Sequence, residues 1–173
     1  MHDLPIFGTL ETMAELGIAL LGFSGVVSVF GRKKALPWTI QDKVWFGGLL
    51  NWSFILIVGG FTPSIMREIF ADIEMVWFTS NLIFFSAHLV SYLWFGYTFY
   101  IKLGSHAFRK VERAIVHPSF VVAASILLAQ AYQIFFPSTH IDVVYVIAVA
   151  WFIYVSCCAF VFMLFPRSDD EVA

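Results

Sequence analysis

The sequence predicts an all-α membrane protein, in which residues 1–173 form a single polytopic bundle of about five transmembrane helices with short amphipathic connectors. Hydrophobic residues make up 60% of the chain and the mean hydropathy is +0.84, whereas soluble globular domains hold ~45–50% apolar residues. Several apolar runs are long enough to cross a hydrocarbon core of about 30 Å. The polar segments between these runs are all short, so we expect no separate soluble domain.

The first span is predicted at about residues 14–30, and it is rich in small residues. No basic segment precedes it, so we expect a retained anchor and not a cleaved signal. Small residues let helix backbones approach closely in lipid, and helical spacing puts Glu15, Gly22 and Gly25 on one face. The candidates for helix–helix or oligomer contact are Gly17, Gly22, Gly25 and Ser28. Alternatively, these residues pack only against neighbours in the same chain.

The second span is predicted at about residues 44–61, with Asn51 near its middle. Residues 39–42 have the Thr-x-x-Asp pattern of a helix N-terminus. Two glycines and Pro63 are expected to end the span. An isoleucine at every fourth position then predicts a short surface helix within residues 63–74.

The third span, at about residues 75–100, is the longest apolar run and has His88 close to its midpoint. Asn81, His88, Ser91 and Tyr92 fall on one helical face. Polar groups aligned in this way are expected to face protein or water and not lipid.

The last two spans are predicted at about residues 119–136 and 143–165. Residues 102–118, which precede the fourth span, are basic with a narrow apolar stripe, so they predict an amphipathic connector on an anionic leaflet. The fourth span carries Gln130 and Gln133 on one face.

The distribution of positive charge predicts the orientation. If the segments after the first and third spans and the C-terminus are cytoplasmic, nine of the ten Lys and Arg residues lie inside, and Arg67 is the exception. The positive-inside rule therefore predicts the N-terminus outside and the C-terminus inside, in a cell membrane that we expect to be the bacterial inner membrane. A re-entrant first helix is the alternative. Candidates for contact with anionic lipid or a partner are Arg32, Lys33, Lys34, Arg109, Lys110 and Arg113.

Polar residues inside the spans are the candidate functional residues. A rise of about 1.5 Å per residue puts Asn51, His88 and Tyr154 near the midplane. The full set of candidates for a polar path is Glu15, Asn51, Asn81, His88, Gln130, Gln133 and Tyr154. Ionisable groups at such depth are costly and commonly functional, although interhelical hydrogen bonds that only orient helices are the alternative for each of them.

Two functions follow from these observations. The first is an oligomeric channel or pore with a polar path past His88, which could gate it because histidine titrates near neutral pH. The second is a non-catalytic membrane subunit or anchor that docks a partner protein. The HExxH, CxxC, P-loop and GxSxG patterns are missing, and no second histidine lies at the depth of His88 to hold a haem. We therefore expect no enzyme activity, no metal, no cofactor and no nucleic acid partner.

Overall fold

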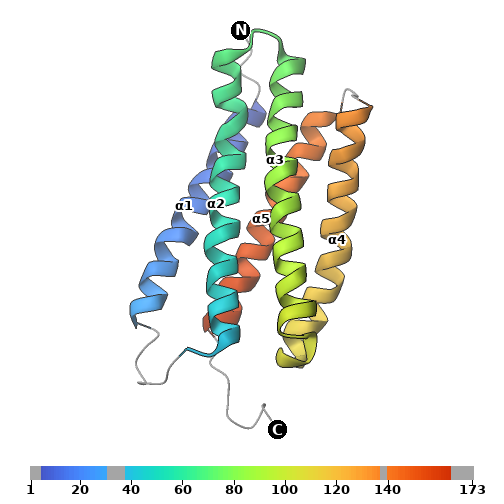
Figure 1. The fold of residues 1–173 in the computed structure, drawn as a ribbon. Coiled ribbons are helices and arrows are strands. Elements are labelled where there is room, and N and C mark those ends of the chain that lie inside the picture. The colour runs from blue at the N-terminus through green and yellow to red at the C-terminus, as the bar shows by residue number, and fades with distance from the viewer. Residues whose placement is uncertain (1–4, 31–37, 137–139, 165–173) are drawn as a thin grey trace.

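The computed structural model describes residues 5–30, 38–136 and 140–164, with only the backbone described at residues 5 and 27–30. Five long helices account for nearly all of them (Figure 1). Each helix is long and apolar enough to cross a membrane. The helices are α1 (Pro5–Phe30), α2 (Ile40–Ile69), α3 (Ile73–Gly96), α4 (Lys110–Phe135) and α5 (Ile141–Leu164). The predicted all-α bundle of a multi-pass membrane protein is confirmed.

Helix α2 lies at the centre of the bundle. In its most apolar window 56% of the residues are buried, against 17% for α1. Among the long helices, α1 contacts mainly α2 and α5, and α4 contacts mainly α3 and α5. Helices α1 and α4 therefore flank the bundle on opposite sides (Figure 1). We call the end where α2 and α4 begin the basic end, because Lys43, Lys102 and Lys110 lie there.

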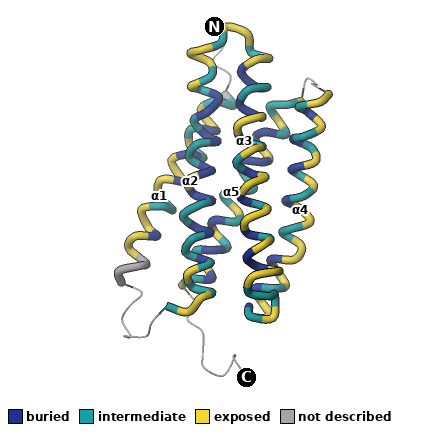
Figure 2. The backbone as a smooth tube through the Cα atoms, in the orientation of Figure 1, coloured by how far each residue is buried: buried dark blue, intermediate teal, exposed yellow. Residues whose placement is uncertain are grey.

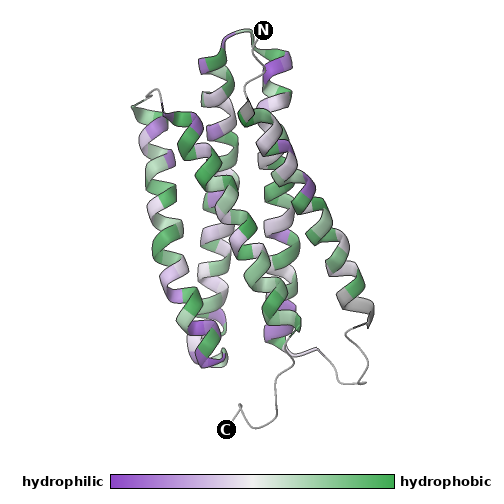
Figure 3. Ribbon diagram, turned by 180° about the vertical axis from the view of Figure 1, so that it is seen from behind, coloured by the Kyte–Doolittle hydropathy of each residue, from purple (hydrophilic) through white to green (hydrophobic). Residues whose placement is uncertain are grey.

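The outer surface of the bundle is apolar along its length. Figure 2 shows exposed positions on every helix, and many of them carry large hydrophobic side chains, such as Ile101 at 73% and Leu128 at 72% exposure. Hydrophilic residues gather toward the two ends of the helices (Figure 3). A surface of this kind suits a hydrocarbon environment and would be costly in water.

The predicted end of the second span is wrong, because α2 continues through Pro63 to Ile69 and no separate surface helix forms. Proline has no N–H to donate to the carbonyl four residues earlier, here Gly59. The hydroxyl of Tyr145 on α5 donates to that carbonyl oxygen instead, at 2.7 Å. A donor from a neighbouring helix thus replaces the missing helical bond, and the helix persists.

The fourth span is also longer than predicted. Helix α4 begins at Lys110 and passes through Pro118, so the connector shrinks to the π-helix Tyr97–Lys102, the short 3-10 helix Ser105–Ala107 and the residues around them. Phe108 and Val116, both within the predicted connector, are only 3% and 5% exposed. Their burial in the core holds the first turns of α4 in the bundle.

The other elements agree with prediction more closely. The first helix begins at Pro5, nine residues before the predicted start, while α3 and α5 lie within a few residues of the predicted spans. Proline is favoured in the first turn of a helix. The N-terminus of α2 has the predicted capping box, in which Thr39 Oγ1 accepts from Asp42 N at 3.1 Å and Thr39 N donates to Asp42 Oδ2 at 2.9 Å.

Candidate functional site

Three buried polar side chains join α3 to α4. His88 Nδ1 lies 2.9 Å from Gln130 Oε1. Gln130 Nε2 donates to Asn81 Oδ1 at 3.3 Å, and Asn81 Nδ2 donates to the backbone oxygen of Gln130 at 3.1 Å. Their exposures are 0%, 0% and 2% for Asn81, Gln130 and His88. We call these three residues the amide–histidine cluster.

A second polar contact joins α2 to α3 one turn further along. Asn51 Nδ2 donates to Ser91 Oγ at 2.8 Å, and the indole of Trp52 donates to the same oxygen at 3.1 Å. Asn51 therefore meets Ser91 and does not bond to His88, which was its expected neighbour from depth alone.

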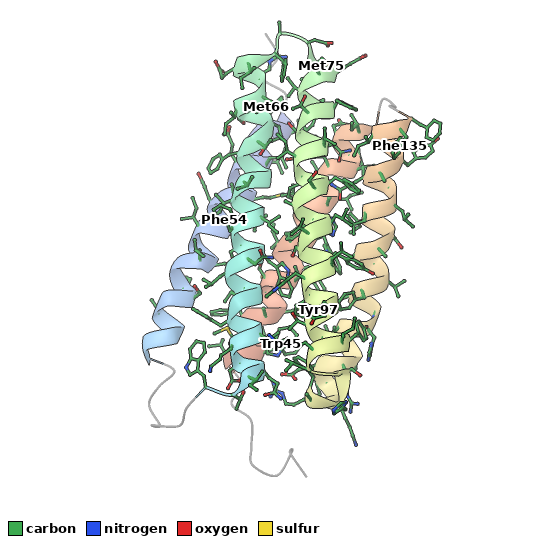
Figure 4. The ribbon with its side chains drawn as sticks, in the orientation of Figure 1. Trp45, Phe54, Met66, Met75, Tyr97 and Phe135 are labelled. Atoms are coloured by element: carbon green, nitrogen blue, oxygen red, sulfur yellow. The ribbon has the colours of Figure 1, made fainter. Side chains whose placement is uncertain are left out.

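A partly open pocket lies between α3, α4 and α5, with α2 at its back, and its cavity volume is about 60 Å³. His88 and Ser91 line it from α3. Most of the other lining side chains are apolar and many are aromatic, including Trp45, Trp52, Phe95, Phe120, Trp151 and Phe152. Figure 4 shows Trp45 on α2 near the basic end.

A buried carboxylate lies beside the pocket, at the basic end, in contact with Trp45. Glu112 is 1% exposed and accepts from Trp45 Nε1 at 3.1 Å. Arg109 pairs with the same carboxylate at 3.0 Å and donates to the backbone oxygen of Phe162 on α5 at 3.4 Å. These contacts connect α2, α4 and α5, which carry Trp45, Glu112 and Phe162. Trp45 and Phe162 both line the pocket.

The predicted lipid-contact residues divide into three groups. Arg109 bonds within the chain, as described above. Lys110 is exposed and Arg113 half-buried, both at the basic end. Arg32, Lys33 and Lys34 lie outside the described residues.

Two of the other polar candidates lie away from the amide–histidine cluster. Glu15 is exposed on α1, and α1 packs on α2 and α5, across the bundle from Gln130. Tyr154 is 46% exposed and lines the pocket. Gln133, one turn beyond Gln130 on α4, is buried at 6% exposure.

The small residues of α1 differ in how closely neighbouring helices approach them. Gly17 is buried against α2, where an added Cβ would lie 3.0 Å from Ile57 Cγ1 and 3.1 Å from Ser53 O. At Gly22 and Gly25 an added Cβ would meet no atom of the described residues within 4 Å, since α1 leans away from α2 toward the basic end (Figure 1). The side chain of Ser28 lies outside the described residues.

Two important residues, Glu112 and Tyr145, were missed by the sequence reasoning. Glu112 was assigned to a surface connector. Tyr145 had a signal that could have been used, because Pro63 within a long apolar run leaves one carbonyl in need of a donor. Among the residues that the structure describes, no three His, Cys, Asp or Glu side chains gather as a metal site.

No family model, curated protein or solved structure matches this chain.

Proposed function

We propose that this multi-pass membrane protein binds a small bilayer-soluble molecule in the pocket between α3, α4 and α5. The observation that carries the proposal is the lining of the pocket. Small-molecule sites are concave and have mostly apolar, aromatic walls with a few placed polar groups. Here the walls are aromatic and the polar groups are few, with His88 and Ser91 among them.

The position of the mouth favours entry from the lipid. Tyr154 is the exposed lining residue, and half-buried Ser119 and Cys158 flank it on α4 and α5. The surrounding surface is apolar, as shown by Val122 and Val161, each 43% exposed. A ligand dissolved in the hydrocarbon can reach the mouth without crossing water, so its body has to be apolar.

The proposal is tested with 4-pentylanisole, an apolar aromatic probe, added to the purified protein in liposomes. Trp45, Trp52 and Trp151 line the pocket, so their fluorescence reports occupancy. We expect a saturable change in wild type and none in Ala123→Phe, which fills the pocket from α4. A signal that rises linearly and equally in both proteins would show partition into lipid alone and would overturn the proposal.

A second candidate function is the predicted oligomeric channel, formed between copies of the chain. It is favoured by the open face of α1 at Gly22, where an added Cβ would meet none of the described residues within 4 Å, together with the exposed carboxylate of Glu15. Close helix packing through glycine is a common mode of association in lipid. A path past His88 within one copy has no such support, because the amide–histidine cluster is buried and bonded to itself.

Ion flux from liposomes tests the channel. We expect flux that falls in Glu15→Gln, and no flux at any pH or voltage would contradict this function. The mass of the protein in detergent separates this candidate from the membrane subunit or anchor, because a monomer that acquires mass only with a different protein would favour the latter.

A further inference from the structure

We propose, on the basis of the pocket function above, that the pocket selects molecules that carry a hydroxyl group, and that Nε2 of His88 accepts the hydrogen bond from this hydroxyl. Asn81 and Gln130 act as positioning residues, because their hydrogen bonds determine which ring nitrogen of His88 carries the proton. The ligand class is an apolar molecule with one hydrogen-bond donor.

A backbone carbonyl determines how the side-chain amides of Asn81 and Gln130 are oriented. The main-chain oxygen of Gln130 can only accept a hydrogen bond, so the Asn81 side-chain atom 3.1 Å from it is the amide nitrogen. This orientation places Oδ1 of Asn81 opposite the side chain of Gln130. Since Oδ1 can only accept, the Gln130 atom 3.3 Å from it is Nε2.

The same orientation determines the tautomer of His88. With Nε2 of Gln130 directed to Asn81, its Oε1 lies 2.9 Å from Nδ1 of His88. An amide oxygen only accepts, so Nδ1 carries the proton. In the neutral ring Nε2 then keeps a lone pair and acts as an acceptor. The assignment comes from the hydrogen-bond network, which allows a single consistent arrangement.

The acceptor nitrogen is directed toward the pocket. No hydrogen bond joins Nε2 to any of the described residues, and His88 lines the pocket while being only 2% exposed. The fully enclosed side-chain N and O atoms without a partner, among the described residues, are the hydroxyl oxygens of Ser53, Ser80 and Ser156. Nε2 is not one of them. The two nitrogens of an imidazole point in nearly opposite directions, so Nε2 points away from Gln130, on the side where His88 lines the pocket.

The surroundings of Nε2 favour a ligand that donates a hydrogen bond to it. Phe152 packs edge to face on the His88 ring, with centroids 5.0 Å apart, and the other walls are mostly apolar. An acceptor without a partner in such surroundings is unfavourable, and a donor that reaches it restores the lost bond. Ser91, one turn further along α3, accepts from both Asn51 and Trp52, so its own hydrogen can serve the oxygen of the same hydroxyl.

A matched pair of probes tests the inference. The phenol 4-pentylphenol has the donor, and the ether 4-pentylanisole lacks it while keeping a similar shape. We expect the phenol to bind the wild-type protein roughly tenfold more tightly, as for one hydrogen bond gained in an apolar site. In His88→Phe the ether should bind as before, and the ratio of the two affinities should fall to about one.

The outcomes separate this inference from the pocket function. Saturable binding of both probes with equal affinity in wild type would overturn hydroxyl selection and leave the pocket function standing. If neither probe binds saturably, both proposals fail. A preference for the phenol that persists in His88→Phe would also overturn the inference, since another group would then be the acceptor.

A spectroscopic measurement does not depend on the stability of His88→Phe. Replacement of His2, His106, His117 and His140 by glutamine leaves His88 as the single histidine. With 15N-histidine labelling we expect Nδ1 to be protonated and Nε2 to be unprotonated, and the phenol alone to shift the Nε2 resonance. In Gln130→Leu the fixed tautomer should become a mixture. A proton found on Nε2 in the otherwise native protein would overturn the inference.

Discussion

Two regions of the bundle show opposite ways of packing helices in a membrane. Around Gly59 and Gly60 of α2, glycine lets the neighbouring helices α1 and α3 approach closely. We call this region the tight interface. An added Cβ at Gly60 would lie 2.5 Å from the backbone oxygen of Leu10 and 2.6 Å from Ala14 Cβ on α1, and one at Gly59 would overlap the ring of Phe84 on α3. Between α3, α4 and α5, by contrast, the helices leave room for the pocket.

The difference comes from side-chain shape and size. Glycine has no side chain, so a ring or a backbone from the next helix fills its place. The pocket is lined by large, rigid rings. Trp52 and Phe95 pack edge to face at 68° with centroids 4.9 Å apart, and Phe95 and Phe120 stack at 16°. Rigid rings fill an interface less completely than glycine contacts do, so dense packing and a pocket occur in neighbouring parts of one bundle.

The largest expected effect comes from Gly60→Val in the tight interface. The added side chain would overlap the backbone at Leu10 and Ala14, which cannot move without displacing α1. We expect a loss of about 3 kcal/mol or more of unfolding free energy, measured by denaturant titration in detergent. The matched control is Gly22→Val on the open face of α1, which should change stability by less than about 0.5 kcal/mol. Equal effects of the two substitutions would contradict the comparison.

A pair of alanines tests the same contrast on α5 and α4. Ala148 is 0% exposed in the core and Ala123 lines the pocket. We expect Ala148→Phe to cost about 3 kcal/mol through overpacking, while Ala123→Phe enters existing space and costs less than about 1 kcal/mol. Thermal unfolding measures both, and a larger loss in Ala123→Phe would show that the pocket is not free space.

Removal of the carboxylate at the basic end should open the pocket. In Glu112→Ala, Trp45 and Arg109 lose the acceptor that they share. We expect a loss of about 2 kcal/mol, as for hydrogen bonds to a charged group, together with weaker binding of the ether probe. Glu68→Ala, at an exposed position of α2, is the control and should behave as wild type.

The smallest expected effect on the free energy of unfolding comes from Tyr145→Phe, next to Pro63. Tyr145→Phe removes the hydroxyl that donates to Gly59 O, which should cost about 1 kcal/mol. In a Pro63→Ala background the helix regains its own N–H donor, so the same substitution should cost less. A double-mutant cycle measures the coupling, and strictly additive effects would mean that the tyrosine does not replace the missing helical bond.

Sequence reasoning identified the spans and the buried faces with fair accuracy. Asn81, His88 and Ser91 share a face because helical periodicity is local, and all three are buried in the structure. It failed at the end of α2, because glycine and proline end a helix only when nothing outside the helix compensates. It also failed at the start of α4, where a basic segment was assigned to a surface connector. At Gly59 the compensation comes from a residue 86 positions away in the chain, which no local pattern contains.

The sequence by itself determined that this is an all-α multi-pass membrane protein with five apolar helices, since length and hydropathy are properties of each segment alone. It also determined which polar residues share a helical face. Only the tertiary structure decided that Gln130 meets His88 and Asn81, that Glu112 is buried against Trp45, and that a pocket opens beside α5. These facts depend on how neighbouring helices are rotated and inclined, which is settled by side-chain packing between segments distant in the sequence.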